Sequence, residues 1–245
     1  MTGRIFTIIS LTAAVAVLLS SCVNMPSSAA GAVQGTGEMV SRDFQTEDFT
    51  SIDISGSFTV IYRQDQNISV VVDMQENLFQ HLQVLVRGGT LYIDSARQFN
   101  TSNANRPRLY INAPALEAIR FSGAIDAAEW DAISIQSFSV SVEGAANIAL
   151  ALEADQLDVS VAGASNIELS GNAAAAGISI EGAGRVSADN LQTRDANVSI
   201  SGAGGVIIAV SDNLDVSIDG AGSVRYIGSP NVTRSIAGIG TVRHN

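Results

Sequence analysis

Three carboxylates recur at one position of a repeat in the C-terminal half of the chain. Glu143, Glu181 and Asp219 each come directly before a glycine and alternate with neighbouring Ile and Val residues. Glycoside hydrolysis needs two carboxyl groups roughly 5 to 9.5 Å apart. If each repeat contributes one strand to a stacked sheet, these carboxylates are two strands, or about 9.6 Å, apart. The pattern therefore has two interpretations: the acids of a carbohydrate-active enzyme, or a solvated face.

Arg225 and Arg243 form a second candidate group. Each stands five residues after a repeat glycine, in neighbouring repeats, so stacking would place them one strand apart. Two guanidinium groups at that spacing could flank an anion or a saccharide, or they could protect an exposed sheet edge with charge. With the three carboxylates, these arginines are the candidate ligand-binding residues.

The rest of the sequence lacks the spacing of a catalytic or metal site. The two histidines, His81 and His244, are far apart in the sequence, and no His/Cys cluster has metal-ligand spacing. No base accompanies a serine, and no glycine-rich loop precedes a predicted helix. We therefore expect no catalytic residue, no metal and no cofactor.

The single cysteine, Cys22, predicts a covalent lipid. Arg4 and the apolar stretch 5–19 have the form of a secretory signal, which is shorter than a membrane-spanning helix. The sequence Leu19-Ser20-Ser21-Cys22 resembles the lipobox of bacterial lipoproteins, in which the cysteine is lipidated and becomes the first mature residue. A plain signal peptide with an incidental cysteine is the alternative. Because no Asp follows Cys22, the outer membrane is favoured over the inner one.

Composition limits the partners. The net charge is −11, from 24 acidic residues and 13 basic residues, and all the basic residues are arginine. Such a chain lacks the basic footprint of a nucleic-acid-binding protein, so we expect no nucleic acid. The expected partners are the membrane, through the lipid anchor, and a glycan or another envelope protein.

The candidate residues must be positioned by a repeat of 18 to 21 residues. Apolar residues at positions −4, −2 and +4 from each glycine alternate with polar or small ones, which indicates strands with one buried face. Glycines at position 0 and position +2 share the parity of the apolar residues. The pattern therefore predicts that both face a narrow interior. The seven anchoring glycines are Gly123, Gly144, Gly163, Gly182, Gly202, Gly220 and Gly238.

This period fits one coil of a parallel β-solenoid, whose coils stack about 4.8 Å apart. We predict an all-β fold of about seven coils over 119–245, capped by a β-rich module over 42–118. Within the module, Gly56 looks like the centre of a displaced eighth copy, 76–82 is expected to form a helical turn, and 85–93 a hairpin. Before the module we predict a signal peptide over 1–21 and a flexible tether over 22–41, rich in Ser, Ala and Gly.

These motifs resemble the family described as putative auto-transporter adhesin, head GIN domain. The resemblance covers about 42–245 and rests on the segment 111–119 (INAPALEAI) followed by Gly-Ala-x-Asn-Ile at 144–148 and 163–167. Later copies depart from the motif, with Arg185, Gly205, Ser223 and Thr241 in place of Asn. The resemblance implies a β-solenoid on an exported bacterial lipoprotein with an adhesin-like role, and it implies no active-site residues.

We therefore predict a non-enzymatic, lipid-anchored envelope module with a binding or structural role. A polysaccharide hydrolase or lyase that uses the outward carboxylates is the alternative. Outward aromatic residues would discriminate between them, because saccharide clefts use such residues for stacking. Trp130 and Tyr226 are among the few candidates.

Overall fold

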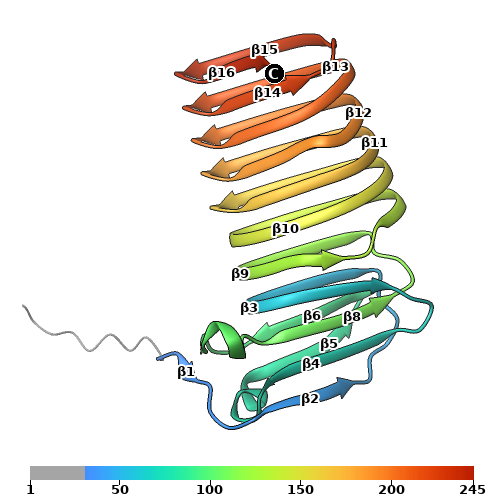
Figure 1. The fold of residues 1–245 in the computed structure, drawn as a ribbon, viewed down its shortest axis with the longest axis vertical. Helices are drawn as coiled ribbons and strands as arrows, with labels where there is room; N and C mark the ends of the chain where they lie inside the picture. The colour runs from blue at the N-terminus through green and yellow to red at the C-terminus, as the bar shows by residue number, and fades with distance from the viewer. Residues whose placement is uncertain (1–30) are drawn as a thin grey trace, which may run out of the picture. The chain divides into compact units, whose positions relative to one another are not determined.

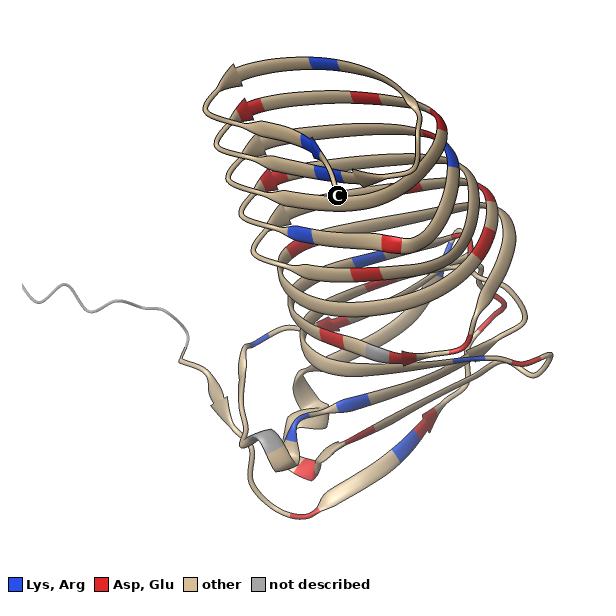
Figure 2. Ribbon diagram, turned by 45° about the horizontal axis from the view of Figure 1, so that its top comes forward, with Lys and Arg blue, Asp and Glu red and all other residues tan. Residues whose placement is uncertain are grey.

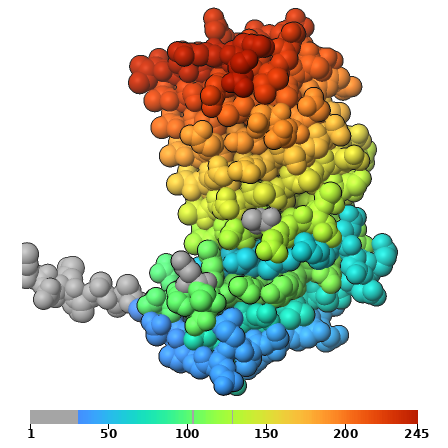
Figure 3. All heavy atoms as spheres, viewed as in Figure 1, coloured from blue at the N-terminus to red at the C-terminus, as the bar shows by residue number. Residues whose placement is uncertain are grey.

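The alternating residues of the repeats form the strands of a parallel β-solenoid, as predicted (Figure 1). The computed structural model describes residues 31–245. The glycines of the seven repeats stack in register and bound about six full turns, one fewer than the seven coils expected. Successive coils stack without a break in the space-filling view (Figure 3). The strands of the repeats are β9 (Ala118–Trp130), β10 (Ile133–Gly163), β11 (Asn166–Gly182), β12 (Arg185–Gly202), β13 (Gly205–Gly220), β14 (Ser223–Ile227), β15 (Asn231–Gly238) and β16 (Thr241–His244).

Each coil crosses two sheets that enclose a common core. The residues that lead into each repeat glycine form one, the leading sheet, and the residues that follow it form the other, the following sheet. Val198 and Ile200 in the leading sheet and Val206 and Ile208 in the following sheet are all buried. The apolar positions −4, −2 and +4 therefore face the interior, as the alternation predicted.

The glycines at position 0 do not face the interior, which corrects the prediction for them. They lie at the corner between the two sheets, half-buried or exposed, with positive φ in every copy, for example 127° at Gly202. The Gly182 carbonyl oxygen accepts a hydrogen bond from the Ala203 N–H at 2.8 Å. A β-carbon on Gly202 would lie 2.5 Å from the same oxygen. These positions therefore require glycine for its backbone conformation and for the close approach of the preceding coil.

The glycines at position +2 do face the core, as predicted. A β-carbon on Gly204 would lie 2.7 Å from the Ile180 Cγ2 atom, and one on Gly222 the same distance from the Ile200 Cγ2 atom. At Gly184 the nearest atom to such a β-carbon is the Val161 Cγ1 atom, at 2.8 Å. The branched side chains at position −2 of the preceding coil thus occupy the space that a side chain at position +2 would need.

The N-terminal module extends both sheets. The leading sheet continues from β9 through β3 and β6 to β5, and the following sheet continues from β9 through β3, β8 and β4 to β2. Gly56 pairs with Gly123 and has a φ of 135°, so the predicted eighth copy is confirmed. The helical turn and the Gly88-Gly89 hairpin are also present. The elements are β2 (Met39–Phe44), β3 (Ser51–Gln64), β4 (Ser69–Gln75), the 3₁₀ helix η1 (Glu76–His81), β5 (Leu82–Arg87), β6 (Thr90–Ser95), η2 (Asn103–Asn105) and β8 (Arg108–Ala113).

Strands begin earlier than the predicted boundary at residue 42. Strand β1 (Val33–Gln34) pairs with β7 (Phe99–Asn100), and β2 starts at Met39 and pairs antiparallel with β4. Both β1 and the start of β2 fall in the segment 22–41 for which a flexible tether was expected. The tether prediction is therefore wrong from Val33 onward, because these residues hydrogen-bond to the module.

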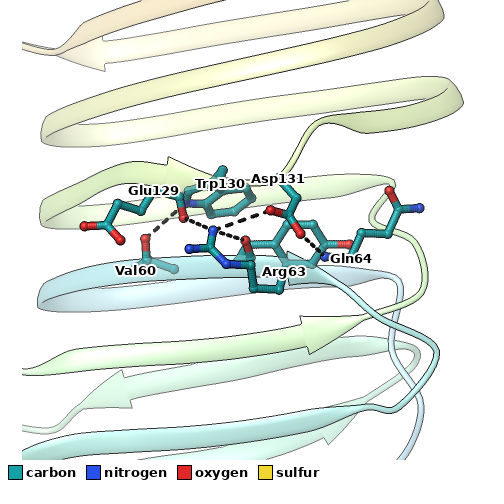
Figure 4. A network of polar contacts seen from close by, with 7 residues as sticks. Val60, Arg63, Gln64, Glu129, Trp130 and Asp131 are labelled. Atoms are coloured by element: carbon teal, nitrogen blue, oxygen red, sulfur yellow. Dashed lines mark hydrogen bonds and ion pairs between the residues drawn. The ribbon is translucent and has the colours of Figure 1, made fainter.

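Polar contacts join the module to the first coil (Figure 4). Arg63 lies 3.5 Å from the Asp131 carboxylate and donates to the backbone carbonyls of Tyr62 and Glu129. The Trp130 Nε1–H donates to the Val60 carbonyl at 3.1 Å, and its ring lies 5.2 Å from the Tyr62 ring. Trp130 therefore serves as a structural contact between β3 and β9.

Candidate functional site

The outward side of the leading sheet carries three rows of mostly small, polar side chains. We call it the serine face, because its middle row holds a serine in six successive coils. The middle row is Tyr92, Asp53, Arg120, Ser141, Ser160, Ser179, Ser199, Ser217 and Ser235. The row beside the glycines is Asp94, Ser55, Ser122, Glu143, Ala162, Glu181, Ser201, Asp219 and Ala237, and the third is Thr90, Ser51, Ala118, Ser139, Asp158, Gly177, Asn197, Asp215 and Thr233. The face offers hydrogen-bonding groups along the whole described fold.

The N-terminal end of the serine face is hollowed where β6, β3, β9 and β10 lie side by side. The hollow has a volume of about 430 Å³, and its lining includes Asp53, Tyr92 and Arg120. The Arg120 guanidinium lies 3.8 Å from the Asp53 carboxylate and 4.0 Å from that of Glu143. The Tyr92 side chain is large and exposed. An aromatic ring, a cation and a carboxylate therefore line one hollow, and a second carboxylate, that of Glu143, lies beside its cation.

The electrostatics of this hollow single out Asp53. Burial raises the pKa of its carboxyl group above the usual range, and the like charges of Glu143 and Asp94 raise it further, while Arg120 opposes them. Asp53 is only partly exposed, whereas Glu143 and Arg120 are mostly exposed. The hollow therefore combines a partly desolvated acceptor with a solvated donor, the arrangement that binds a ligand bearing both hydroxyl donors and acceptors.

A second hollow lies at the centre of the serine face. It has a volume of about 270 Å³ and forms around Gly177, which has no side chain between Asp158 and Asn197 in the third row. The serines Ser160, Ser179 and Ser199 line its other side. The two hollows share one surface, so an extended ligand along the solenoid axis could contact both.

The predicted carboxylates share a row but do not form one site. Glu143, Glu181 and Asp219 are exposed on the serine face, with Ala162 and Ser201 in the coils between them. They are therefore two coils, or about 9.6 Å, apart along the row. Of the three, only Glu143 lies within 4.0 Å of a cation that belongs to residues 31–245.

The predicted arginines lie on the other sheet. Arg225 and Arg243 pair in register on β14 and β16, as the spacing indicated. Both project from the following sheet, so they cannot join the carboxylates of the serine face in one site. Tyr226 packs edge-to-face against His244, with ring centroids 5.3 Å apart. The lipidation residue, Cys22, lies outside the described residues.

Sequence reasoning missed the residues of the first hollow. Asp53 and Arg120 occupy the middle-row position that is serine in the six later coils, and that departure was a usable signal. Tyr92 carries no such signal, because only the parallel pairing of β6 with β3 brings it to the same row. Among residues 31–245 the exposed aromatic side chain is therefore that of Tyr92, whereas those of Trp130 and Tyr226 are half-buried.

Two further observations concern metal binding and membrane-spanning helices. Among residues 31–245, no group of three or more His, Cys, Asp or Glu side chains is arranged to hold a metal ion. None of the helices in this described part has the length and apolar character needed to span a bilayer.

Comparisons with known proteins agree with this fold. The model of the family described as putative auto-transporter adhesin, head GIN domain, matches residues 48–230. A putative adhesin from Bacteroides fragilis NCTC 9343 has a similar structure, with a TM-score of 0.79 and 23% identity over 87% of this chain and 100% of that chain. One from Parabacteroides merdae ATCC 43184 has a TM-score of 0.69 and 22% identity over 87% and 98%. A putative lipid binding protein from Parabacteroides distasonis ATCC 8503 has a TM-score of 0.65 and 21% identity, over 88% of this chain and 100% of that chain.

At these identities the structural likeness shows the fold. No curated protein sequence matches the chain. The family and these structures are described as adhesins or lipid-binding proteins, and none is described as an enzyme.

Proposed function

Because this chain belongs to the putative auto-transporter adhesin, head GIN domain family, we propose that it is a non-enzymatic binding module of the cell envelope that holds a neutral glycan on its serine face. The observation that carries the proposal is the meeting of Tyr92, Asp53 and Arg120 in one hollow of a long polar face. A chain of net charge −11 repels polyanions, which favours a neutral ligand.

Each group in the hollow has a part in binding a sugar. The Asp53 and Glu143 carboxylates accept hydrogen bonds from ring hydroxyls, and the Arg120 guanidinium donates to hydroxyl and ring oxygens. The Tyr92 ring offers an apolar surface for the C–H face of a pyranose, with a polar tip that remains solvated. The serine rows beyond the hollow supply weaker hydrogen bonds to following residues of a polymer. In this proposal these contacts bind the glycan without cleaving it.

The binding proposal predicts a strong effect of two truncations. Tyr92→Ala and Arg120→Ala should each weaken the binding of a neutral oligosaccharide about tenfold or more, because aromatic and arginine anchors dominate the binding energy of such surfaces. An array of glucans, mannans and galactans identifies a ligand for the purified full chain, and calorimetry then measures its affinity. Ser217→Ala, on the same face but several coils away, is the matched control and should change affinity less than twofold.

Two outcomes would contradict the proposal. The first is that both truncations leave the affinity unchanged, which would move the site away from the hollow. The second is that the glycan becomes shorter with time, and that Asp53→Asn or Glu143→Gln stops the shortening. That second result would favour the carbohydrate-active enzyme instead.

The place of the module in the cell is proposed from the N-terminal motif. The signal-like segment 5–19 and the lone Cys22 support export and lipid anchoring, with the outer membrane favoured. Cys22→Ala should move most of the protein from the membrane fraction to the soluble fraction of its native cells, because a lost lipid removes the main membrane affinity. Fractionation followed by immunoblotting measures the ratio. A variant that stays with the membrane as the wild type does would exclude the lipid anchor.

A further inference from the structure

The last coil departs from the repeat in three ways. Position −4 is a buried Ile or Val in the six preceding repeats but is the exposed Arg234 here. Position +1 is alanine in those six repeats but is Ile239 here, with 83% of its surface exposed. No carboxylate side chain follows Asp219, whereas residues 221–245 contain Arg225, Arg234 and Arg243. In Figure 2 the basic segments of this end lie on and beside the terminal strands.

This end also presents open strand edges. All eight residues of β15 are exposed, and β15 pairs only with β13, while β16 pairs only with β14. Within residues 31–245 no element packs on their outer side, and the core-facing Val232 and Ile236 remain 36% and 39% exposed. Open strand edges with exposed apolar side chains invite pairing with another chain unless charge or a cover prevents it.

The opposite end of the described fold is complementary. Its sheets finish at β5 and β2, whose outer edges are also unpaired. Met39 on β2 is 39% exposed, and Val84 on β5 is half-buried. The segment 38–48 carries four carboxylates (Glu38, Asp43, Glu47 and Asp48) and one arginine, a net charge of −3. The β2 edge thus has the opposite charge to the C-terminal end, whereas β5 carries Arg87 and no carboxylate.

We propose that the C-terminal end of the solenoid docks on the N-terminal end of a second copy of this chain, with β15 and β16 placed along β5 and β2. Opposite charges favour the part of this contact where Arg243 of β16 meets the acidic segment 38–48, whereas two C-terminal ends would bring their arginines together. The contact covers Val232, Ile236 and Ile239 and satisfies edge backbone groups on both copies. Because its two surfaces differ, the contact repeats, and the copies form an open line.

Two end variants test the proposal. The tail variant carries Arg234→Glu and Ile236→Glu, and the head variant carries Met39→Arg and Asp43→Arg; all four residues are exposed. Sedimentation velocity of the purified full chain in mild detergent should show growth beyond a dimer as the wild-type concentration rises. Each variant alone should remain a monomer. In an equal mixture, the unchanged N-terminal end of the tail variant can pair with the unchanged C-terminal end of the head variant. The two remaining ends are both altered, so association should stop at a dimer.

Controls separate association from folding. Ser160→Glu adds a carboxylate to the serine face on β10, in the middle of the stack and away from both ends, and it should associate as the wild type does. Thermal unfolding of both end variants should match that of the wild type within a few degrees, because their changes lie on exposed residues. A head variant that dimerises by itself would overturn the proposal in favour of paired C-terminal ends. A wild type that stays monomeric up to about 1 mM, the concentration that corresponds to a 4.1 kcal/mol contact, would overturn it altogether.

Discussion

Gly202→Ala should lower the free energy of unfolding by about 3 kcal/mol or more. The φ of 127° at this corner is strained for any residue with a β-carbon, at a cost of about 1–3 kcal/mol. The new β-carbon would also lie 2.5 Å from the Gly182 carbonyl oxygen. That oxygen is fixed by its hydrogen bond to Ala203, so overpacking adds about 1–3 kcal/mol more. Chemical denaturation of the purified variant measures the change.

The matched control for this change is its outward neighbour. Ser201→Ala alters an exposed side chain on the serine face and should change the free energy of unfolding by no more than about 0.5 kcal/mol. Because each coil packs only on its neighbours, damage at Gly202 should also lower the hydrogen-exchange protection of the adjoining β11 and β13. Equal destabilisation by the two variants would mean that the corner tolerates a β-carbon and that the positive φ does not require glycine.

The strands could be predicted from the sequence, but the corners could not. Ile200 and Val206 have even offsets from Gly202, and both are buried, so the count of alternating residues gave the right face for them. The same count put Gly202 itself in the core. A count of alternating residues does not detect the positive φ that turns the chain from one sheet to the other. A positive φ changes the direction of the backbone without adding or removing a residue. The repeat pattern therefore predicted the strands of each coil correctly, but not the corner position of the repeat glycine.

The candidate site was less predictable than the fold. The Gly88-Gly89 hairpin was visible in the sequence, since it depends on neighbouring residues. Its parallel pairing with β3, which brings Tyr92 beside Asp53, joins segments about 40 residues apart, and no local pattern specifies that choice. Strand β2 was missed for a similar reason, because its partner β4 lies about 30 residues later in the chain and no local pattern specifies the pairing.

A second prediction concerns the glycines that do face the core. Gly204→Ala should destabilise the fold by about 1–3 kcal/mol, because its β-carbon would lie 2.7 Å from the Ile180 Cγ2 atom in close-packed space. Gly204 has no positive φ, so the cost comes from packing rather than from backbone strain. Removal of the Ile180 Cγ2 atom should therefore relieve it. Valine would not do so, since the Val161 Cγ1 atom lies 2.8 Å from the place of a β-carbon on Gly184.

The double variant Ile180→Ala, Gly204→Ala tests this exchange of volume. Ile180→Ala alone should cost about 2–5 kcal/mol. In the pair, the Cγ2 atom that meets the new β-carbon is gone and the new methyl group fills part of the cavity, so the combined loss should be smaller than the sum by at least about 0.5 kcal/mol. The same Ile180→Ala change should not rescue Gly202→Ala, whose β-carbon meets a backbone carbonyl that no side-chain substitution removes. Denaturant titration of the five variants gives both couplings. In our interpretation, core side chains exclude a β-carbon at Gly204, and the backbone of the preceding coil excludes one at Gly202. Strict additivity at Gly204, or rescue at Gly202, would contradict this difference between the two positions.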